Sequence, residues 1–584
     1  MNIISFSKKS GTEITIIFIK ISIIAFFSFY FLSNFQPYYE GADSYVNALT
    51  SIKITQGSYE ITNPLLQQTG LHEFVPRQWV ITESNTAVPA FNVGLPVIGS
   101  IFYSLFGYYG LFYLIPLCSI SLLIISERIS TKLFGSLGGL ITLILVSSNL
   151  FIIRTGTDFL SENISTIFIL IAFFYILKLL QNYKNSYMLL ISTTLAISTF
   201  LRIGNIVFFP LEIIILIVFI IIKNYNTISN NHTSFSTIKL HKNLIRSFYF
   251  LIPWIIFLTF WFSYNDTFFG DSTKSYLEVK KEMDPSLYYN VDSFSFTPTS
   301  ENLENLKIFT QYLLPYPLSG ARTLETNYES ILGTEWLGII SMILLCGILL
   351  YSFLTKSKRT EIFLILIIIA GIVWFYSIVS GDIDPNRSVP GRYMITPFVF
   401  TSFLFGFIVE KFLSHEFLKN IHFKQILRFL IIISAIVFFI FTITTLTPIM
   451  NWINSDDKIK NPSDVFQKYP LDKENLDENS IVISALGARV VDYDFIPFHP
   501  FLGVTILSGS NPEEFPTKPI LLLNNLLLEN HDVYTFKEET HWVEKKYLNY
   551  LVMNHNFVLK DFSKSFCKLE LKNQEFEISD ENCL

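Results

Sequence analysis

The chain has 584 residues, of which 51% are hydrophobic, 16% aromatic and 15% charged, and its formal net charge is −6 at pH 7. Ordinary soluble domains carry about 25% charged residues. The composition therefore argues against a soluble protein and is typical of a chain that crosses a membrane many times. A small negative charge without a basic face gives no reason to expect nucleic acid as a partner.

Apolar runs of membrane-spanning length recur along the chain, each bounded by polar or charged residues. They lie at about 14–33, 109–126, 135–153, 163–180, 188–201, 204–222, 247–264, 334–355, 361–380, 395–413 and 428–449. The first run lacks a small-residue cleavage site at its end, which favours a retained span over a removed signal peptide. We expect a mainly α-helical, polytopic membrane protein with about 11 transmembrane helices.

Lys and Arg gather in alternate loops, and this pattern predicts the orientation, because short cytoplasmic loops retain positive charge. The N-terminus is then cytoplasmic, in what we expect to be a prokaryotic cell membrane. The opposite, external side receives a first loop of about 34–108, the short loops 154–162 and 381–394, a segment at 265–333, and everything after about residue 450. We expect a transmembrane domain at 1–449 and an external soluble domain at 450–584.

The external tail carries signs of a small α/β domain. A strand-like run lies at 481–486, an apolar run at 520–528, and a segment with apolar residues at helical spacing at 542–556. Cys567 and Cys583 lie in the same tail. They could pair if the tail faces an oxidising compartment.

Ionisable residues collect on the predicted outer side, close to the ends of the apolar runs. They are Glu40, Asp43, Asp158, Glu162, Arg202, Asp382, Asp384, Arg387 and Arg392. Charge near the membrane is a functional hypothesis by default, whereas charges at loop ends are often only solvated. Both interpretations stay open for each cluster.

Three of these positions have specific alternatives. Glu162 starts an apolar run, where Ser161 or Asp158 would cap a helix and Glu162 would complement its dipole. Arg202 separates two apolar runs, so it either extends to lipid headgroups or binds a phosphate. Arg392, with the tyrosine that follows it, either anchors a helix at the membrane interface or belongs to a site.

Five motifs in chain order resemble the GT-C superfamily of integral membrane glycosyltransferases. They are GADSYVNALTSIKITQGSY with Asp43, AVPAFNVGLPVIGSIFYSLFG, FLSEN with Glu162, FLRIGNIVFFP with Arg202, and PGRYMITPF with Arg392 and Tyr393. The chain is similar in particular to the branch of protein mannosyltransferases and lipid A aminoarabinose transferases, over roughly residues 14 to 450. It departs from the family pattern in the wider spacing of Glu40 and Asp43 and in the absence of a WWD motif from the tail.

The resemblance implies an inverting transfer of a sugar from a polyprenyl-phosphate donor to a protein, lipid or glycan acceptor on the outer face, with membrane lipid as a further partner. Asp43 would be the general base, and Arg392 and Arg202 would stabilise the phosphate leaving group. Glu162 would orient the acceptor, help to coordinate a divalent cation, or hold an arginine in place.

The remaining residues that we expect to bind substrate are Glu40, Tyr45, Asp158 and Tyr393. If a divalent cation is used, Asp43 and Glu162 are its candidate ligands. The competing function is a transporter or flippase for an anionic lipid or solute, which would also need arginines and acids near the membrane.

Overall fold

The structure is a computed structural model of the whole chain. It describes all residues except 1–10, 35–41, 76–78, 91, 183, 215–247, 275, 284–299, 315–320, 323–326, 329–333, 356–357, 380–388, 415–420, 454–475, 478, 484–495, 499–516, 538–541, 564–565, 573–578, 581–582 and 584.

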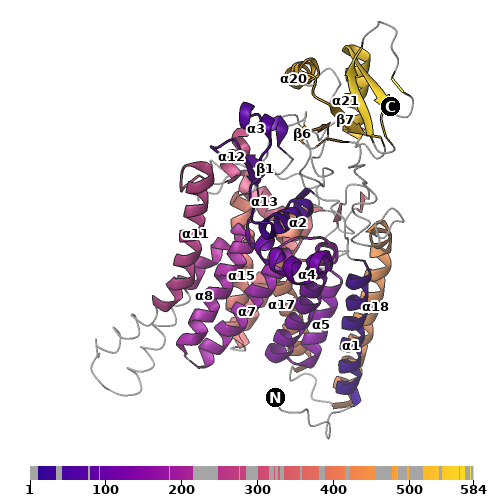
Figure 1. The fold of residues 1–584 in the computed structure, drawn as a ribbon. Coiled ribbons are helices and arrows are strands. Elements are labelled where there is room, and N and C mark those ends of the chain that lie inside the picture. Colours follow the sequence, from indigo (N-terminus) through magenta and orange to yellow (C-terminus); the bar gives the residue numbers. More distant parts are fainter. Residues whose placement is uncertain are drawn as a thin grey trace. The chain divides into compact units, whose positions relative to one another are not determined.

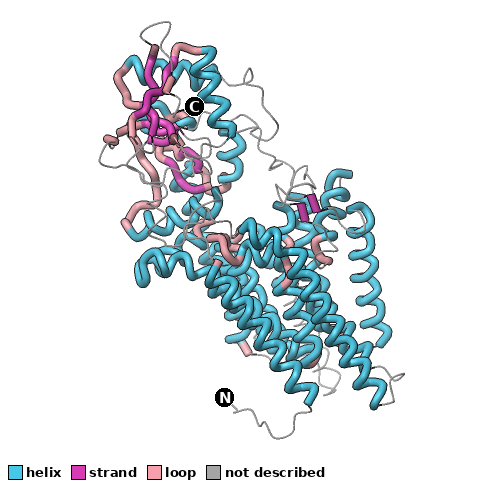
Figure 2. The backbone as a smooth tube through the Cα atoms, turned by 90° about the vertical axis from the view of Figure 1, so that its right-hand side faces the viewer, coloured by secondary structure: helices cyan, strands magenta, loops and turns pink. Residues whose placement is uncertain are grey.

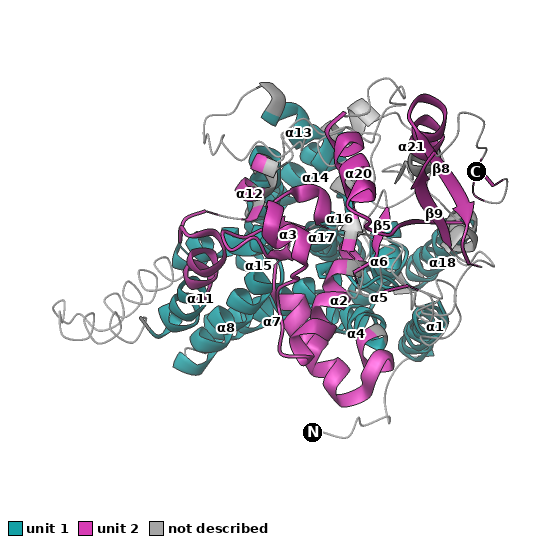
Figure 3. Cartoon of the chain, turned by 45° about the horizontal axis from the view of Figure 1, so that its top comes forward, with its two compact units in different colours: residues 1–35, 113–259, 290–456 teal, residues 36–112, 260–289, 457–584 magenta. Residues whose placement is uncertain are grey.

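The chain divides into two compact units, each assembled from three separate stretches of sequence (Figure 3). Unit 1 consists of residues 1–35, 113–259 and 290–456, and unit 2 of residues 36–112, 260–289 and 457–584. The predicted boundary between a transmembrane domain at 1–449 and an external domain at 450–584 rests on membrane topology rather than on compactness. It stays a prediction.

Unit 1 is helical, and its long helices run alongside one another (Figures 1 and 2). Its elements are α1 (Gly11–Ser33), the second part of α4 (Gly94–Phe134), α5 (Ser136–Ser147), α6 (Leu150–Thr155), α7 (Glu162–Gln181), α8 (Asn185–Leu201), the 3-10 helices η3 (Ile203–Val207) and η4 (Phe248–Phe250), the first part of α11 (Leu251–Phe269), α13 (Ser300–Gln311), the two-residue strands β3 (Ala321–Arg322) and β4 (Asn327–Tyr328), α14 (Thr334–Thr355), α15 (Arg359–Val379), α16 (Val389–Tyr393), α17 (Ile395–Ser414) and α18 (Ile421–Ile453).

Helices overlap all the apolar runs expected from the sequence. In the described chain, six helical segments are long and apolar enough to cross a membrane: Gly11–Ser33, Tyr113–Phe134, Glu162–Gln181, Arg359–Ile378, Ile395–Ser414 and Gln425–Thr444. Apolar side chains point outward from them; Phe29 of α1, for example, is 73% exposed. Such exposed apolar faces are stable only against lipid or another protein. These helices indicate an integral membrane protein, and the count of eleven crossings stays a prediction.

The run expected at 135–153 is interrupted in the structure. Helix α5 ends at Ser147, and Asn149 then starts α6 by accepting hydrogen bonds from the backbone N–H groups of Phe151 and Ile152 at 3.0 and 3.1 Å. An asparagine side chain in this position satisfies helix N–H groups that have no partner within the helix. One apolar run thus becomes two short helices.

A buried ion pair joins α1 to α4. Lys20 Nζ donates to Glu127 Oε1 at 2.6 Å and to Thr131 Oγ1 at 2.8 Å, and the side chains of Lys20 and Glu127 are 8% and 9% exposed. Charges in such surroundings are tolerated when they are paired and hydrogen-bonded. The pair therefore links α1 directly to α4 within unit 1.

Unit 2 contains the elements that follow the first span and those of the C-terminal tail. They are α2 (Ala42–Thr55), α3 (Pro64–Thr69), η2 (His72–Phe74), β1 (Trp79–Ile81), β2 (Ala87–Pro89), the first part of α4, the end of α11, α12 (Tyr276–Met283), β5 (Ile481–Ile483), β6 (Ile496–Phe498), α20 (Thr517–Leu528), β7 (Val533–Phe536), α21 (Trp542–Asn554), β8 (Phe557–Asp561) and β9 (Phe566–Leu571). The tail forms a five-stranded sheet of order β6-β5-β7-β9-β8, in which β5 is parallel to β6 and β7, whereas β9 is antiparallel to β7 and β8.

Alternate residues of the sheet enter different cores, as the period of two along a strand requires. In β5, Ile481 and Ile483 join a core with apolar residues of α20 and α21, whereas Val482 joins a smaller cluster on the opposite face. The larger core also contains residues of the first loop, including Phe74, whose ring centroid lies 5.8 Å from that of Phe498. The predicted small α/β fold of the tail is confirmed, and the first loop contributes to its core.

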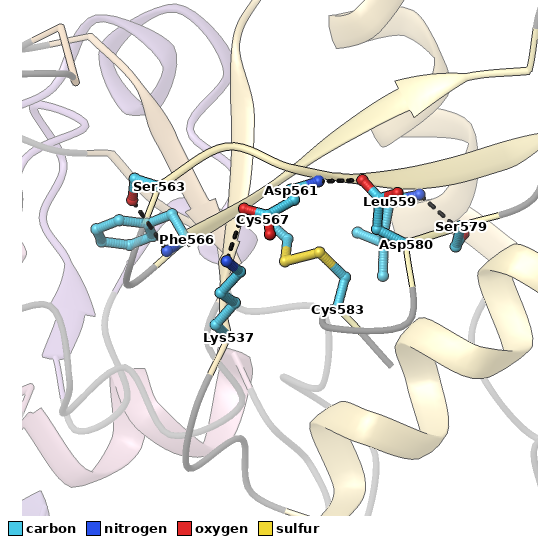
Figure 4. The surroundings of a disulfide bond; sticks show 9 residues. All are labelled: Lys537, Leu559, Asp561, Ser563, Phe566, Cys567, Ser579, Asp580 and Cys583. Carbon is cyan, nitrogen blue, oxygen red and sulfur yellow. Dashed lines mark hydrogen bonds and ion pairs between the residues drawn. A yellow bond between two sulfur atoms is a disulfide. The ribbon is translucent and has the colours of Figure 1, made fainter.

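Cys567 and Cys583 form a disulfide that ties the end of the chain to β9 (Figure 4). Nearby, Ser579 Oγ accepts from the backbone N–H of Leu559 at 2.9 Å, so the same C-terminal segment is also hydrogen-bonded to β8. Disulfides persist in oxidising compartments. The external placement of the tail stays a prediction.

Replacement of both Cys567 and Cys583 by Ser should destabilise unit 2. A loop of about 15 residues closed by a disulfide contributes about 3 kcal/mol in the chain-entropy account. We expect faster proteolysis of the C-terminal region of the full-length protein in detergent, with the spanning helices unaffected. Cys346→Ser, which removes an exposed free thiol, is the control; an equal effect of both changes would contradict the prediction.

Lys20→Met should destabilise the full-length protein by about 3 kcal/mol, because it leaves Glu127 charged and without its buried partner. The double variant Lys20→Met/Glu127→Leu should recover most of this loss, since two apolar side chains can replace a buried ion pair. Thermal unfolding in detergent measures both. A double variant less stable than Lys20→Met would disprove the pairing argument.

Candidate functional site

Glu162 opens α7 and is buried in spite of its charge, with 7% of its side chain exposed. Ser161 occupies the N-cap position, but its side chain makes no capping hydrogen bond. The interpretation of Ser161 as a side-chain cap is therefore wrong. A helix N-terminus favours an anion through its backbone N–H groups, so the start of α7 supplies part of what the carboxylate needs.

Two arginines from distant parts of the sequence approach the Glu162 carboxylate. Arg202 Nη1 lies 3.3 Å from Glu162 Oε1, and Arg392 Nε lies 3.6 Å from the same oxygen. Arg202 follows α8 in an extended conformation, with φ −153° and ψ 107°, and Arg392 belongs to α16. Guanidinium groups pair with carboxylates and phosphates through the same fork of N–H donors, so two of them at one pocket suit an anionic ligand.

Two tyrosines contact these arginines. The rings of Tyr376 in α15 and Tyr393 in α16 are stacked, with centroids 4.9 Å apart and an interplanar angle of 3°. The Arg202 guanidinium lies 4.6 Å from the Tyr393 centroid, and its Nε donates to Tyr376 Oη at 2.8 Å. The Arg392 guanidinium lies 5.4 Å from the Tyr393 centroid. Cation–π contacts therefore add to the ion pairs in orienting both side chains.

These groups line a small pocket among α7, α15, α16, α17 and the segment that follows α8. Its lining consists of Glu162, Thr166, Arg202, Asn205, Ile372, Tyr376, Arg392, Tyr393, Ile395 and Thr396. The Thr166 and Thr396 hydroxyls are hydrogen-bonded to each other at 2.7 Å. The pocket thus combines guanidinium, amide, hydroxyl and apolar groups, a mixture that suits a ligand with an anionic head and an apolar part.

Close packing next to the pocket depends on a glycine. A Cβ atom added to Gly391 would lie 1.9 Å from the ring of Phe151. A larger residue at position 391 would have to displace the Phe151 ring, so the glycine permits the present packing of α16 against this side chain of α6. Gly391 directly precedes Arg392, so this packing helps to set the position of the Arg392 backbone.

The structure brings together Glu162, Arg202, Arg392 and Tyr393 from the set expected on sequence grounds. Asp158 lies in the turn between α6 and α7, is half-buried, and does not belong to the pocket lining.

The other expected residues are found elsewhere in the chain. Asp43 lies in the first turn of α2 in unit 2 and is half-buried. The side chain of Tyr45 and the whole of Glu40 lie outside the described residues, as do Asp382, Asp384 and Arg387.

The described residues include no group of three or more His, Cys, Asp and Glu side chains that could hold a metal ion. Around Glu162 the charged neighbours are two guanidinium groups. A divalent cation prefers oxygen ligands of negative charge, so this part of the site fits an anion rather than a metal ion.

Sequence reasoning missed Tyr376, Asn205, Thr166 and Thr396. Tyr376 is one of 29 tyrosines in the chain and lies near the end of an apolar run, where an aromatic residue is also common for reasons of membrane anchoring. Nothing local distinguishes it, because its role depends on an arginine 174 positions away.

Glu162→Gln should lower the stability of the full-length protein by about 3 kcal/mol, because two half-buried guanidinium groups lose their shared, buried counter-charge. Glu361→Gln is a matched control, since Glu361 pairs with Lys358 at 3.3 Å in a more exposed setting and should lose about 0–1 kcal/mol. Thermal unfolding in detergent measures both changes. Equal losses would show that the Glu162 pairs are no stronger than surface ion pairs.

No protein-family description matches the chain, and no curated protein matches it. Among solved structures, it is similar to the oligosaccharyltransferase of Archaeoglobus fulgidus in the apo form, with 13% identity over 96% of this chain and 75% of that one and a TM-score of 0.48. It is also similar to ArnT from Cupriavidus metallidurans bound to undecaprenyl phosphate, with 9% identity over 96% of this chain and 98% of that one and a TM-score of 0.48. Both are GT-C glycosyltransferases, the superfamily that the sequence motifs resemble. At TM-scores below 0.5 these similarities assign no role to any residue.

Proposed function

We propose that this protein is a membrane glycosyltransferase that transfers a sugar from a polyprenyl-phosphate donor to an acceptor on the outer face of the membrane. The observation that supports it most is the meeting of Arg202 and Arg392 on the buried Glu162 carboxylate, at a pocket lined by the ends of apolar helices. Guanidinium groups match phosphate oxygens in charge and in the geometry of their donors.

The charge of the site supports a phosphate ligand. Arg202 carries more N–H donors than those that face Glu162 and Tyr376, and phosphate oxygens of the donor would accept from them. The apolar helices around the pocket would meanwhile accommodate the lipid to which that phosphate is attached. Membrane lipid would be the medium from which the donor enters.

The reaction would be a single displacement at the anomeric carbon of the sugar. An acceptor hydroxyl oxygen forms the new bond to this carbon, and the bond from the carbon to the phosphate oxygen breaks, with the electron pair leaving on the phosphate. Arg202 and Arg392 stabilise the charge that develops on that leaving group. One displacement inverts the anomeric configuration.

The proton of the acceptor hydroxyl needs a base, and we assign this role to Asp43. A carboxylate within hydrogen-bond reach of the hydroxyl typically contributes a factor of about 10² to 10⁴ to the rate. Asp43 lies at the start of α2 and is half-buried. Its motif in the first loop, similar to that of the GT-C superfamily, supports the assignment.

Glu162 would hold the arginines. Of the three roles considered for it, this one agrees with its two ion pairs and with its burial. A carboxylate that already pairs with two guanidinium groups is committed to those cations rather than to a metal ion or an acceptor. Glu162 would thus shape the phosphate site without contacting the acceptor.

Asp43→Asn should lower sugar transfer by about 10² to 10⁴-fold while leaving donor binding intact, because the arginines are unchanged. The assay uses the full-length protein in liposomes with a labelled polyprenyl-phosphate sugar and a membrane extract of the source cells as acceptor. It measures the label transferred from the lipid to the acceptor. Asp266→Asn, at an exposed position of α11, is the control and should transfer normally. Normal transfer by Asp43→Asn would refute its role, and movement of the lipid across the bilayer without transfer would favour the carrier function.

A further inference from the structure

Among the described residues, the hydroxyl group of Tyr376 makes one hydrogen bond, and its partner is Arg202. Tyr376 lies near the end of α15 and is 8% exposed. Its Oη accepts a hydrogen bond from Arg202 Nε at 2.8 Å, and this is its one hydrogen bond within the described chain. A buried hydroxyl normally has a partner, so the fold commits this group to Arg202.

The backbone next to Arg202 leaves space for this hydroxyl. A Cβ atom added to Gly204 would lie 2.3 Å from Tyr376 Oη and 2.9 Å from its Cζ. Atoms do not approach so closely, so any larger residue at position 204 would displace the phenol or the turn. The glycine two residues after Arg202 therefore permits the contact between η3 and α15.

Arg202 is restrained from three directions. Nε donates to Tyr376, Nη1 faces Glu162 at 3.3 Å, and the guanidinium plane lies over the Tyr393 ring. Among the described residues, none accepts a hydrogen bond from Nη2. Contacts at two nitrogens and over one ring restrain the guanidinium plane, and they thereby set the direction in which its remaining donors point.

We propose that Tyr376 is a positioning residue, which aligns the free donors of Arg202 with the phosphate of the lipid donor without touching the substrate itself. This inference rests on the proposed function, in which Arg202 binds that phosphate. Preorganised donors bind more tightly because no ordering of the side chain remains to be paid on binding. Loss of the Tyr376 hydroxyl should therefore weaken phosphate binding through Arg202 alone.

The test measures the dissociation constant of undecaprenyl phosphate for the full-length protein in detergent. Tyr376→Phe keeps the stacked ring and removes only the hydroxyl, and should weaken binding about 10-fold, the order expected for one hydrogen bond to a charged group. Tyr30→Phe is the control, since Tyr30 Oη is buried without a hydrogen-bond partner in the described chain, and binding should not change. Thermal unfolding of each variant confirms that it is folded.

A double-mutant cycle decides whether Tyr376 acts through Arg202. Arg202→Lys keeps the charge and loses the Nε donor, and should weaken binding at least as much as Tyr376→Phe. If Tyr376 acts only through Arg202, Tyr376→Phe/Arg202→Lys should bind no more weakly than Arg202→Lys alone. A further 10-fold loss in the double variant, or normal binding by Tyr376→Phe, would overturn the positioning role. Normal binding by Arg202→Lys would instead overturn the phosphate site in the proposed function.

Discussion

The buried carboxylate of Glu162 is the constraint around which unit 1 is organised. An ion in these surroundings must be compensated, and here the compensation comes from the N-terminus of α7, from Arg202 after α8 and from Arg392 in α16. Two guanidinium groups from distant segments converge on this one carboxylate. The ion pairs that link α7, α16 and the segment after α8 thus also place guanidinium donors at the pocket.

Aromatic stacking and glycines make this arrangement rigid. The stacked rings of Tyr376 and Tyr393 link α15 to α16 and cover the guanidinium of Arg202. Gly204 and Gly391 leave space for the Tyr376 phenol and the Phe151 ring, which a Cβ at either position would displace. Rigidity of this kind is useful to a site that binds phosphate, since donors that are already aligned lose little entropy on binding.

Unit 2 is stabilised by different means. Its core combines the first loop with the tail, so residues such as Phe74 and Phe498 pack together across more than four hundred positions of sequence. A disulfide closes the end of the chain onto β9. Asp43, the proposed base, begins a helix whose Val46 and Leu49 belong to this core. The stability of the tail is therefore linked to the position of α2.

The sequence alone determined the helical, membrane-spanning character of the chain, since apolar runs and their polar boundaries are local properties. It also identified Glu162, Arg202 and Arg392 as candidates, because charge beside an apolar run is conspicuous, and Tyr393 through the resemblance of its motif to the GT-C pattern. Only the tertiary structure decided that these residues meet and that Tyr376 joins them, because contacts between α7, α8, α15 and α16 depend on packing between distant segments. The tertiary structure also decided where the first loop packs. Its apolar residues could have covered lipid or protein, and they are buried with the tail in one core to which several distant segments contribute.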